Sequence, residues 1–163
     1  MTVLPDVLKT KLKVVFCGTA AGTTSGRLQY YYAKPSNRFW EVLSRTGFTR
    51  SRLSPYEYGK LLDFGIGLTD LSKSSQGSDR NVSKEELEIE SFRSKILSYA
   101  PKAVAFNGKK AGKLYLNHEV SYGRQFERIG NTVLFVLPST SGAAARYWNE
   151  SYWRELAEFV GLE

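Results

Sequence analysis

The sequence contains only one cysteine and one histidine among its 163 residues. Iron–sulfur clusters held by four thiolates and cysteine-rich zinc sites need several such ligands, so this chain cannot assemble either from its own side chains. We therefore expect no metal and no other cofactor. Cys17 stands in the apolar run 14–17, where a free thiol usually behaves as a small buried hydrophobe. His118 lies outside every motif described below and receives no role.

Long hydrophobic runs are also missing. No apolar stretch approaches the roughly 18 residues that a membrane span requires, and residues 1–10 lack the apolar core and cleavage site of a secretory leader. We expect a soluble protein with a cytoplasmic, nucleoid-associated location and no membrane partner. A chain of this length is typical of one compact domain, so we expect a single domain spanning 1–163 and a monomer.

Acidic residues are the minority charge. The chain has 16 Asp and Glu residues against 23 Lys and Arg, which gives a net charge of +7 and a pI near 9.5. A basic balance of this kind suits a polyanionic partner such as nucleic acid. Taken alone, it equally fits a soluble basic protein.

Short apolar segments alternate with helical patterns along the chain. Apolar runs and a Gly-Asn turn predict strands at 13–17, 66–69, 103–107, 125–129 and 132–137. Capping residues and helical spacing predict helices over 35–47, 54–64, 83–100, 108–116 and from 143 onward. The polar stretch 72–81 predicts an exposed surface loop. This order predicts an α/β fold with a mostly parallel sheet, helices on both faces and a ligand crevice at the carboxyl ends of the strands.

The loop 18–27 is rich in Gly, Ser and Thr. It lacks the lysine of a phosphate-binding P-loop and the three spaced glycines of a dinucleotide-binding turn. By itself it indicates only a tight turn with exposed backbone N–H groups.

Three segments carry a family resemblance: VFCGTAAG at 15–22, YAKPSNRFW at 32–40 and VLPSTSG at 136–142. Together they resemble the uracil-DNA glycosylase superfamily, nearest its mismatch-specific uracil/thymine branch, and the similarity runs from about residue 12 to the final helix. The resemblance implies a three-layer α/β/α sandwich that flips a nucleotide out of double-stranded DNA and hydrolyses its N-glycosidic bond without a metal. Flipping is required because a stacked, paired base cannot be enclosed. The implied base is uracil first, followed by hypoxanthine, xanthine or mispaired thymine.

The first motif departs from the family pattern. Where relatives carry an Asp or Asn that positions water, this chain has Ala20. Its resemblance to branches with an apolar residue there implies that Asn37 orients the water or the sugar. An Asn at this place also simply caps a following helix, and the sequence leaves both interpretations open. Thr19 and Ala20 are then expected to bind the base.

Asp70 takes the place of the family residue that reads the edge of the flipped base, and it is also a catalytic candidate. An ionised carboxylate only accepts hydrogen bonds. Asp70 would therefore read uracil in its protonated form, or act in its ionised form by stabilising an oxocarbenium ion. A strand-end Asp that binds nearby N–H groups is a third interpretation. Tyr32 matches the aromatic residue that stacks on the base. Tyr30 and Tyr31 extend this aromatic wall, and one or two of the three tyrosines are expected to pack in the core, because adjacent aromatic residues cannot all face the pocket.

The last motif resembles the loop that enters the minor groove. Hydroxyl and N–H groups there suit phosphate contacts, and small residues in place of a bulky wedge predict a shallow plug. The expected DNA-binding residues are Lys34, Arg38, Ser139, Thr140, Ser141, Gly142, Ala143 and Arg146.

Three functions follow as hypotheses. The first is a monofunctional glycosylase acting on uracil or a related lesion in DNA, because no lysine occupies a matched catalytic position. The second, motivated by Ala20 and by the lack of a motif histidine, is a module that binds uracil or abasic sites without turnover. The third, a nucleotide-binding α/β enzyme unrelated to DNA, leaves the segment 32–40 and the basic charge unexplained.

Overall fold

One mixed sheet organises the computed structural model, which describes residues 3–73 and 89–162. Its strands are β1 (Val14–Gly18), β2 (Ile66–Asp70), β3 (Ala103–Asn107), β4 (Gly123–Ile129) and β5 (Thr132–Leu137). They lie in the order β2-β1-β3-β5-β4, and all neighbours are parallel except β4 and β5. The predicted mostly parallel α/β sheet is confirmed.

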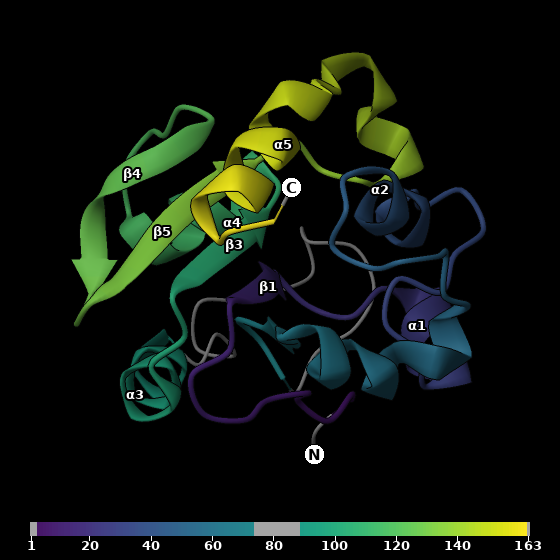
Figure 1. Cartoon of the computed structure of the whole chain (residues 1–163), viewed down its shortest axis with the longest axis horizontal. Coiled ribbons are helices and arrows are strands. Elements are labelled where there is room, and N and C mark those ends of the chain that lie inside the picture. Colours follow the sequence, from purple (N-terminus) through teal and green to yellow (C-terminus); the bar gives the residue numbers. More distant parts are fainter. Residues whose placement is uncertain (1–2, 74–88, 163) are drawn as a thin grey trace.

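Helices cover both faces of this sheet. They are α1 (Thr23–Leu28), α2 (Phe39–Arg45), the 3₁₀ helix η1 (Pro55–Phe64), α3 (Ile89–Tyr99), α4 (Lys109–Leu116), the 3₁₀ helix η4 (Gly142–Tyr147) and α5 (Glu150–Phe159). In Figure 1, α5 passes in front of the sheet and α4 behind it. The three-layer α/β/α sandwich is therefore confirmed.

Alternation along β1 shows why the sheet is buried on both sides. Val14 and Phe16 pack with residues of α2 and α5, whereas Val15 and Cys17 pack with residues of α3 and α4. Successive side chains of a strand point to opposite faces, so both faces of β1 pack against core residues. Cys17 is fully buried, as predicted, and burial raises the pKa of its thiol.

Some boundaries differ from the sequence-based expectations. A short helix, α1, occupies the second half of the glycine-rich stretch, which was expected to form only a turn. The helix expected from 143 onward is interrupted at Trp148, because η4 ends there and the Asn149 side chain caps α5 by accepting from the Ser151 N–H. The predicted start at 83 lies outside the described residues.

The exposed loop predicted over 72–81 is wrong at its first two residues. Ser72 and Lys73 are both buried. The Ser72 N–H donates to the Thr19 carbonyl over 2.8 Å, and the Val3 N–H donates to the Lys73 carbonyl over 2.7 Å. Backbone pairing with neighbouring segments therefore keeps this polar pair inside. The remainder of that loop prediction falls on residues that the structure does not describe.

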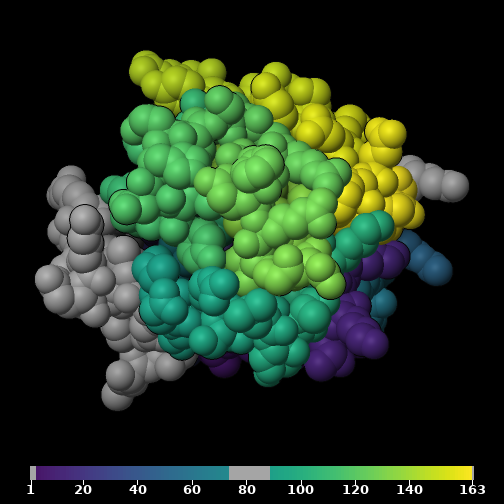
Figure 2. Space-filling model, turned by 90° about the vertical axis from the view of Figure 1, so that its left-hand side faces the viewer, coloured from purple at the N-terminus to yellow at the C-terminus, as the bar shows by residue number. Residues whose placement is uncertain are grey.

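The β4 side of the molecule forms a free sheet edge. Figure 2 views this face, with the green β4 and β5 region in the centre, teal α3 below and the yellow C-terminal helix to the upper right. Arg124 and Arg128 are exposed on β4, and charged side chains on an edge strand discourage pairing with other chains. Within residues 3–73 and 89–162, no helix combines the length and apolar character needed to cross a bilayer.

Candidate active site

A hollow of about 540 Å³ opens at the carboxyl ends of the parallel strands. We call it the base hollow. Gly18 ends β1, Asp70 ends β2 and Asn107 ends β3, and all three line it. Ser139, just beyond β5, completes the set. Because parallel strands end at one edge of a sheet, side chains far apart in the sequence meet here, at the place that the strand order predicted.

Most of the residues expected to act in the site line this one hollow. They are Thr19, Ala20, Tyr32, Lys34, Asn37, Asp70, Ser139, Thr140, Ser141 and Ala143. Arg38, Gly142 and Arg146 do not line it.

Arg38 packs inward. Its guanidinium carbon lies 4.4 Å from the centroid of the Trp148 ring, and its Nε and Nη2 atoms are buried without a hydrogen-bond partner among the described residues. The Arg38 N–H donates to the Thr140 carbonyl over 3.0 Å. Arg146 stands outside the hollow, and its Nη2 donates to the Tyr147 hydroxyl over 2.7 Å.

Asp70 is the buried carboxylate of the site. It is 5% exposed and lies opposite Gly18 in the register of β1 and β2. A Cβ atom added to Gly18 would lie 2.9 Å from Asp70 Oδ1, so this glycine leaves the carboxylate room beside the strand. Burial, and after it the charge of Asp70, raises the pKa of the Tyr31 and Tyr32 phenols. The carboxylate thus influences the aromatic wall of the hollow.

Asn37 combines its two predicted placements. Its Oδ1 accepts from the Phe39 N–H over 3.0 Å, which caps the start of α2, and the same residue lines the base hollow. One lone pair of a carbonyl oxygen suffices for the cap, so the remaining capacity of the amide is compatible with a ligand. Asn37 thus bonds the first N–H of α2 from the position before Arg38, the N-cap residue of this helix. This bond does not remove Asn37 from the site.

Tyr32 forms part of the aromatic wall in a strained conformation. Its backbone has φ of 50°, a left-handed conformation that is costly for a residue with a side chain. Its ring stacks on Phe39 with centroids 4.0 Å apart, so one ring face is already covered. The hydroxyl is buried beside the Asn107 side chain, yet meets no partner in hydrogen-bonding geometry among the described residues.

Tyr31 is 2% exposed and lines the base hollow, so it packs in the core and also forms part of the aromatic wall. Its hydroxyl donates to the Pro5 carbonyl over 2.9 Å and accepts from Lys73 Nζ over 2.9 Å. Lys73 Nζ also lies 2.9 Å from Asp6 Oδ1, and the Thr69 hydroxyl donates to the same carboxylate over 2.7 Å. This buried ion pair anchors the residue next to Tyr32.

Sequence reasoning missed Asn107. Its Nδ2 donates to the Thr140 hydroxyl over 3.0 Å, and its Oδ1 accepts from the Thr140 N–H over 3.1 Å. The two bonds clamp the loop after β5 to the end of β3. The usable signal was a polar residue at the last position of an otherwise apolar strand, at the edge where ligands bind.

Local hydrogen bonds set the shape of the loop after β5. The Ser139 hydroxyl accepts from the Ser141 N–H over 3.1 Å, and the Ser141 hydroxyl accepts from the Ala143 N–H over 3.2 Å. A Cβ atom on Gly142 would lie 2.9 Å from Ser36 Cβ, so this glycine lets the loop approach the segment before α2. The Thr140 side chain is fully buried.

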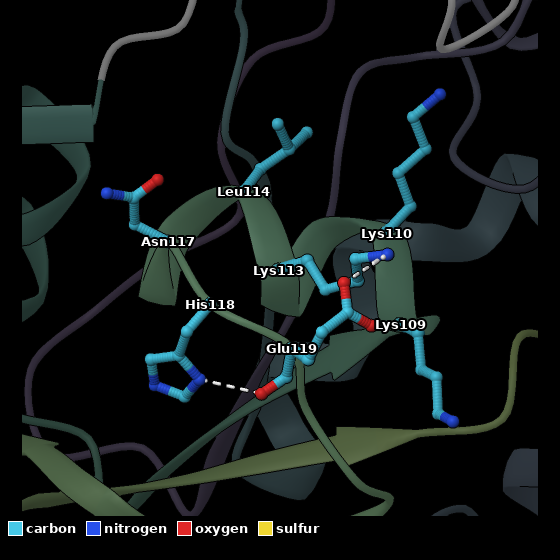
Figure 3. A pocket seen from close by; sticks show the side chains of 7 residues that line it. All are labelled: Lys109, Lys110, Lys113, Leu114, Asn117, His118 and Glu119. Carbon is cyan, nitrogen blue, oxygen red and sulfur yellow. Dashed lines mark hydrogen bonds and ion pairs between the residues drawn. The ribbon is translucent and has the colours of Figure 1, made fainter.

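A separate hollow of about 510 Å³ lies beside α4 (Figure 3). On its wall, Lys113 Nζ lies 3.2 Å from Glu119 Oε2. His118 Nε2 contacts the carboxylate of Glu127, a residue outside the lining, and Lys109 and Lys110 add further positive charge to the wall. A bond to the Glu119 carbonyl, followed by the Glu127 contact, raises the pKa of His118. None of the strand-end residues of the base hollow lines it. His118 does not line the base hollow either.

Comparison with known proteins gives the fold and the family of this chain. The fold is similar to the solution structure of a candidate uracil DNA glycosylase from Methanosarcina acetivorans, with a TM-score of 0.65 and 24% sequence identity over 96% of this chain and 94% of that chain. At this identity the likeness concerns the fold. The family model of the uracil DNA glycosylase superfamily matches residues 5–159. A match over nearly the whole chain means that the protein belongs to the uracil DNA glycosylase superfamily.

Proposed function

We propose that the protein is a DNA glycosylase that flips uracil, or a related deaminated or mispaired base, into the base hollow and hydrolyses its N-glycosidic bond. The observation that carries the proposal is the meeting of Asp70, Asn37 and Tyr32 around one hollow of about 540 Å³. Small-ligand sites typically enclose about 300–1,000 Å³, so the hollow has room for a nucleobase.

The Tyr32 hydroxyl supports a base as the occupant. A buried hydroxyl without a partner costs about 1–3 kcal/mol, and proteins rarely keep such a group without a use for it. The carbonyl and N–H groups on the edge of a flipped base would supply the missing partner. Because Phe39 covers one face of the Tyr32 ring, the hydroxyl contributes recognition in addition to the expected stacking.

Asp70 and Asn37 would divide the chemical work. Water attacks the sugar C1′, the C1′–O bond forms as the C1′–N bond breaks, and the base leaves with the bonding electron pair. Positive charge develops on the sugar, and an ionised Asp70 would stabilise it in this water-poor setting. Asn37 would orient the attacking water or the sugar, since Ala20 offers no polar side chain for that task. The proton lost by the water passes to the departing base or to solvent.

The rim of the hollow suits a DNA strand. Lys34 is exposed there. The Ser139 and Ser141 hydroxyls accept from backbone N–H groups, which leaves the donor capacity of a hydroxyl compatible with a phosphate. The net charge of +7 supports the approach of a polyanion. We assign Lys34 to phosphate contact, so the reaction ends at the abasic site without strand cleavage by the protein. The motifs at 15–22, 32–40 and 136–142 support a place near the mismatch-specific uracil/thymine branch, which we include in the proposal.

A single-turnover assay tests this function. A labelled duplex with one uracil is incubated with the protein, and samples are split before alkali treatment. We expect strand breaks only after alkali, and a loss of about 100-fold or more in rate for Asp70→Asn. Strand breaks without alkali would contradict the monofunctional mechanism. A full rate in Asp70→Asn would remove this residue from the mechanism.

The same assay addresses a second candidate function. Ala20 leaves the first motif without a polar side chain, which favours a module that binds uracil or abasic sites without turnover. Tight, salt-sensitive binding of the uracil duplex with no alkali-labile product would establish the binding module and contradict the proposed glycosylase activity.

A further inference from the structure

A second groove joins the base hollow. It encloses about 430 Å³, and Tyr122 and Tyr147 stand on its wall; we call it the tyrosine groove. Five residues line both spaces, which makes them neighbours with a shared wall: Thr19, Asn107, Ser139, Ser141 and Ala143. A ligand in the base hollow therefore has the tyrosine groove directly beside it.

The lining of the tyrosine groove is cationic and aromatic. Lys109 and Lys110 contribute the charged side chains, and no acidic residue lines the groove. Figure 3 shows that these two lysine side chains leave the start of α4 in opposite directions, so their ammonium groups are spread over the surface. Spread positive charge next to aromatic rings is the combination with which proteins follow a single nucleic acid strand.

Each tyrosine of the groove stands next to a cation. Lys109 Nζ lies 4.6 Å from the centroid of the Tyr122 ring, and Arg146 Cζ lies 4.9 Å from that of Tyr147. Tyr147 is 55% exposed, so its ring is accessible to a ligand. Such a pair suits one nucleotide, because the base can stack on the ring while the phosphate lies beside the cation.

Small residues stand at the boundary between the two spaces. Ala143 lies on the shared wall, and Gly108, Ala111 and Ala144 add little bulk to the groove. The tyrosine groove therefore lies beside the loop in which this chain has alanines in place of a bulky wedge.

We propose that the tyrosine groove binds the nucleobase of the nucleotide next to the flipped one, so that the protein holds two consecutive unstacked nucleotides of one strand. This inference rests on the proposed function, because it takes the base hollow as the site of the flipped base. Consecutive bases of a strand are only about 3.4 Å apart along a duplex, so the neighbour of the flipped base lies close enough to reach an adjoining groove. A strand that is already unstacked, such as single-stranded DNA, presents both bases without the cost of opening a duplex.

Binding measurements on single strands test the groove. The probe is a fluorescent single strand carrying one 2′-fluoro-2′-deoxyuridine, whose electronegative substituent disfavours a cationic transition state and so blocks excision. Two further probes replace the base on its 5′ or its 3′ side with a tetrahydrofuran spacer, which keeps every phosphate. We expect one of these two replacements to raise Kd by roughly 5- to 100-fold, as the loss of one stacked base does, and the other to change Kd far less.

Two variants separate the groove from general DNA effects. Tyr147→Ala removes an exposed ring, and we expect it to weaken binding of the intact probe and to abolish the difference between the two spacers. The matched control is Tyr56→Ala, which removes a tyrosine that is 66% exposed and lines neither space. The control should retain the wild-type sensitivity to the spacer.

The outcomes distinguish the groove from the glycosylase function. If an ordinary uracil strand loses its base but wild-type Kd is the same for both spacers, the groove proposal is overturned and the enzyme stands. If the spacer pattern appears but no uracil is released, the groove stands and the enzyme does not. If no DNA binds at all, both are overturned. An unchanged spacer difference in Tyr147→Ala also overturns the groove.

Discussion

Asp70 Oδ1 lies 2.9 Å from the point that a Cβ atom on Gly18 would occupy. Because glycine has no Cβ, the carboxylate has room at the ends of β1 and β2. The Tyr32 hydroxyl lies 3.7 Å from the same point. Gly18 thus stands where the proposed reader and the proposed catalytic group approach each other.

Gly18→Ala is expected to lower the single-turnover rate of uracil excision by about 10- to 100-fold, because displacing a catalytic group by a fraction of an ångström to one ångström has effects of this size. The matched control is Gly59→Ala, since a Cβ atom there would have nothing within 4 Å. Thermal unfolding should show both variants folded. Equal rates in the two variants would remove Asp70 from the reaction.

Two substitutions of Asn37 separate capping from chemistry. Asn37→Asp keeps an oxygen for the Phe39 N–H, so its stability should stay close to that of wild type, whereas Asn37→Ala should lose about 1 kcal/mol of unfolding free energy. Both changes remove the amide N–H groups and should lower excision by about 10- to 100-fold. Chemical denaturation and single-turnover rates measure the two effects. Wild-type excision by Asn37→Asp would mean that the residue only caps α2.

Tyr32→Phe should have opposite effects on stability and on recognition. Removing a buried hydroxyl that lacks a partner should leave the unfolding free energy unchanged or raise it. Affinity for the uracil strand should fall by about 2- to 10-fold, the value of one neutral hydrogen bond. Urea denaturation and fluorescence anisotropy provide the two numbers.

The neighbouring Tyr31→Phe serves as the comparison for that variant. Its hydroxyl is bonded to the Pro5 carbonyl and to Lys73, so its loss should destabilise the fold by about 1–3 kcal/mol. If Tyr32→Phe also destabilised the fold by that amount, its hydroxyl would be a structural group with a partner.

Asp6→Asn should destabilise the protein because it leaves the ammonium group of Lys73, 6% exposed, without its carboxylate. Breaking a buried ion pair from one side costs about 3–5 kcal/mol. The double variant Asp6→Asn/Lys73→Met should recover part of this loss, since the more deeply buried ammonium group is then gone. Lys95, which also pairs with Asp6 and whose side chain is 19% exposed, loses its partner in both variants. Equal stability of the single and double variants would contradict the pairing.

The Asp6 carboxylate also predicts that the protein loses stability at acidic pH. Burial by itself would raise the pKa of Asp6. The charge of Lys73 and the hydrogen bonds from Lys95 and Thr69 outweigh burial and lower this pKa below 3.8. A group whose pKa is depressed in the folded state stabilises the fold above its unfolded pKa and loses this effect as pH falls through its folded pKa. Wild type should therefore lose stability below about pH 4 more steeply than Asp6→Asn. Parallel curves for the two proteins would contradict this assignment.

Local patterns in the sequence predict much of the fold. The apolar runs of β3 and β5 are buried whatever their partners are, so period and composition alone predict them. The Ser54 capping box is likewise local, and the Glu57 carboxylate does accept from the Ser54 N–H over 3.0 Å. The family resemblance of the motifs predicted Asp70, Asn37 and Tyr32 as site residues.

Only the tertiary structure decided the remainder, because it depends on contacts between distant segments. Polar composition placed Lys73 on the surface, but Asp6, 67 positions earlier, and Tyr31 make its burial favourable. Asn107 acquires its clamping role only where β3 ends beside the loop after β5. Sequence by itself determined which residue types stand at the strand ends, whereas the packing of the strands decided that they surround one hollow with a second groove beside it. Non-local burial and hydrogen bonding leave no periodic signal in the chain, so no local pattern could have predicted them.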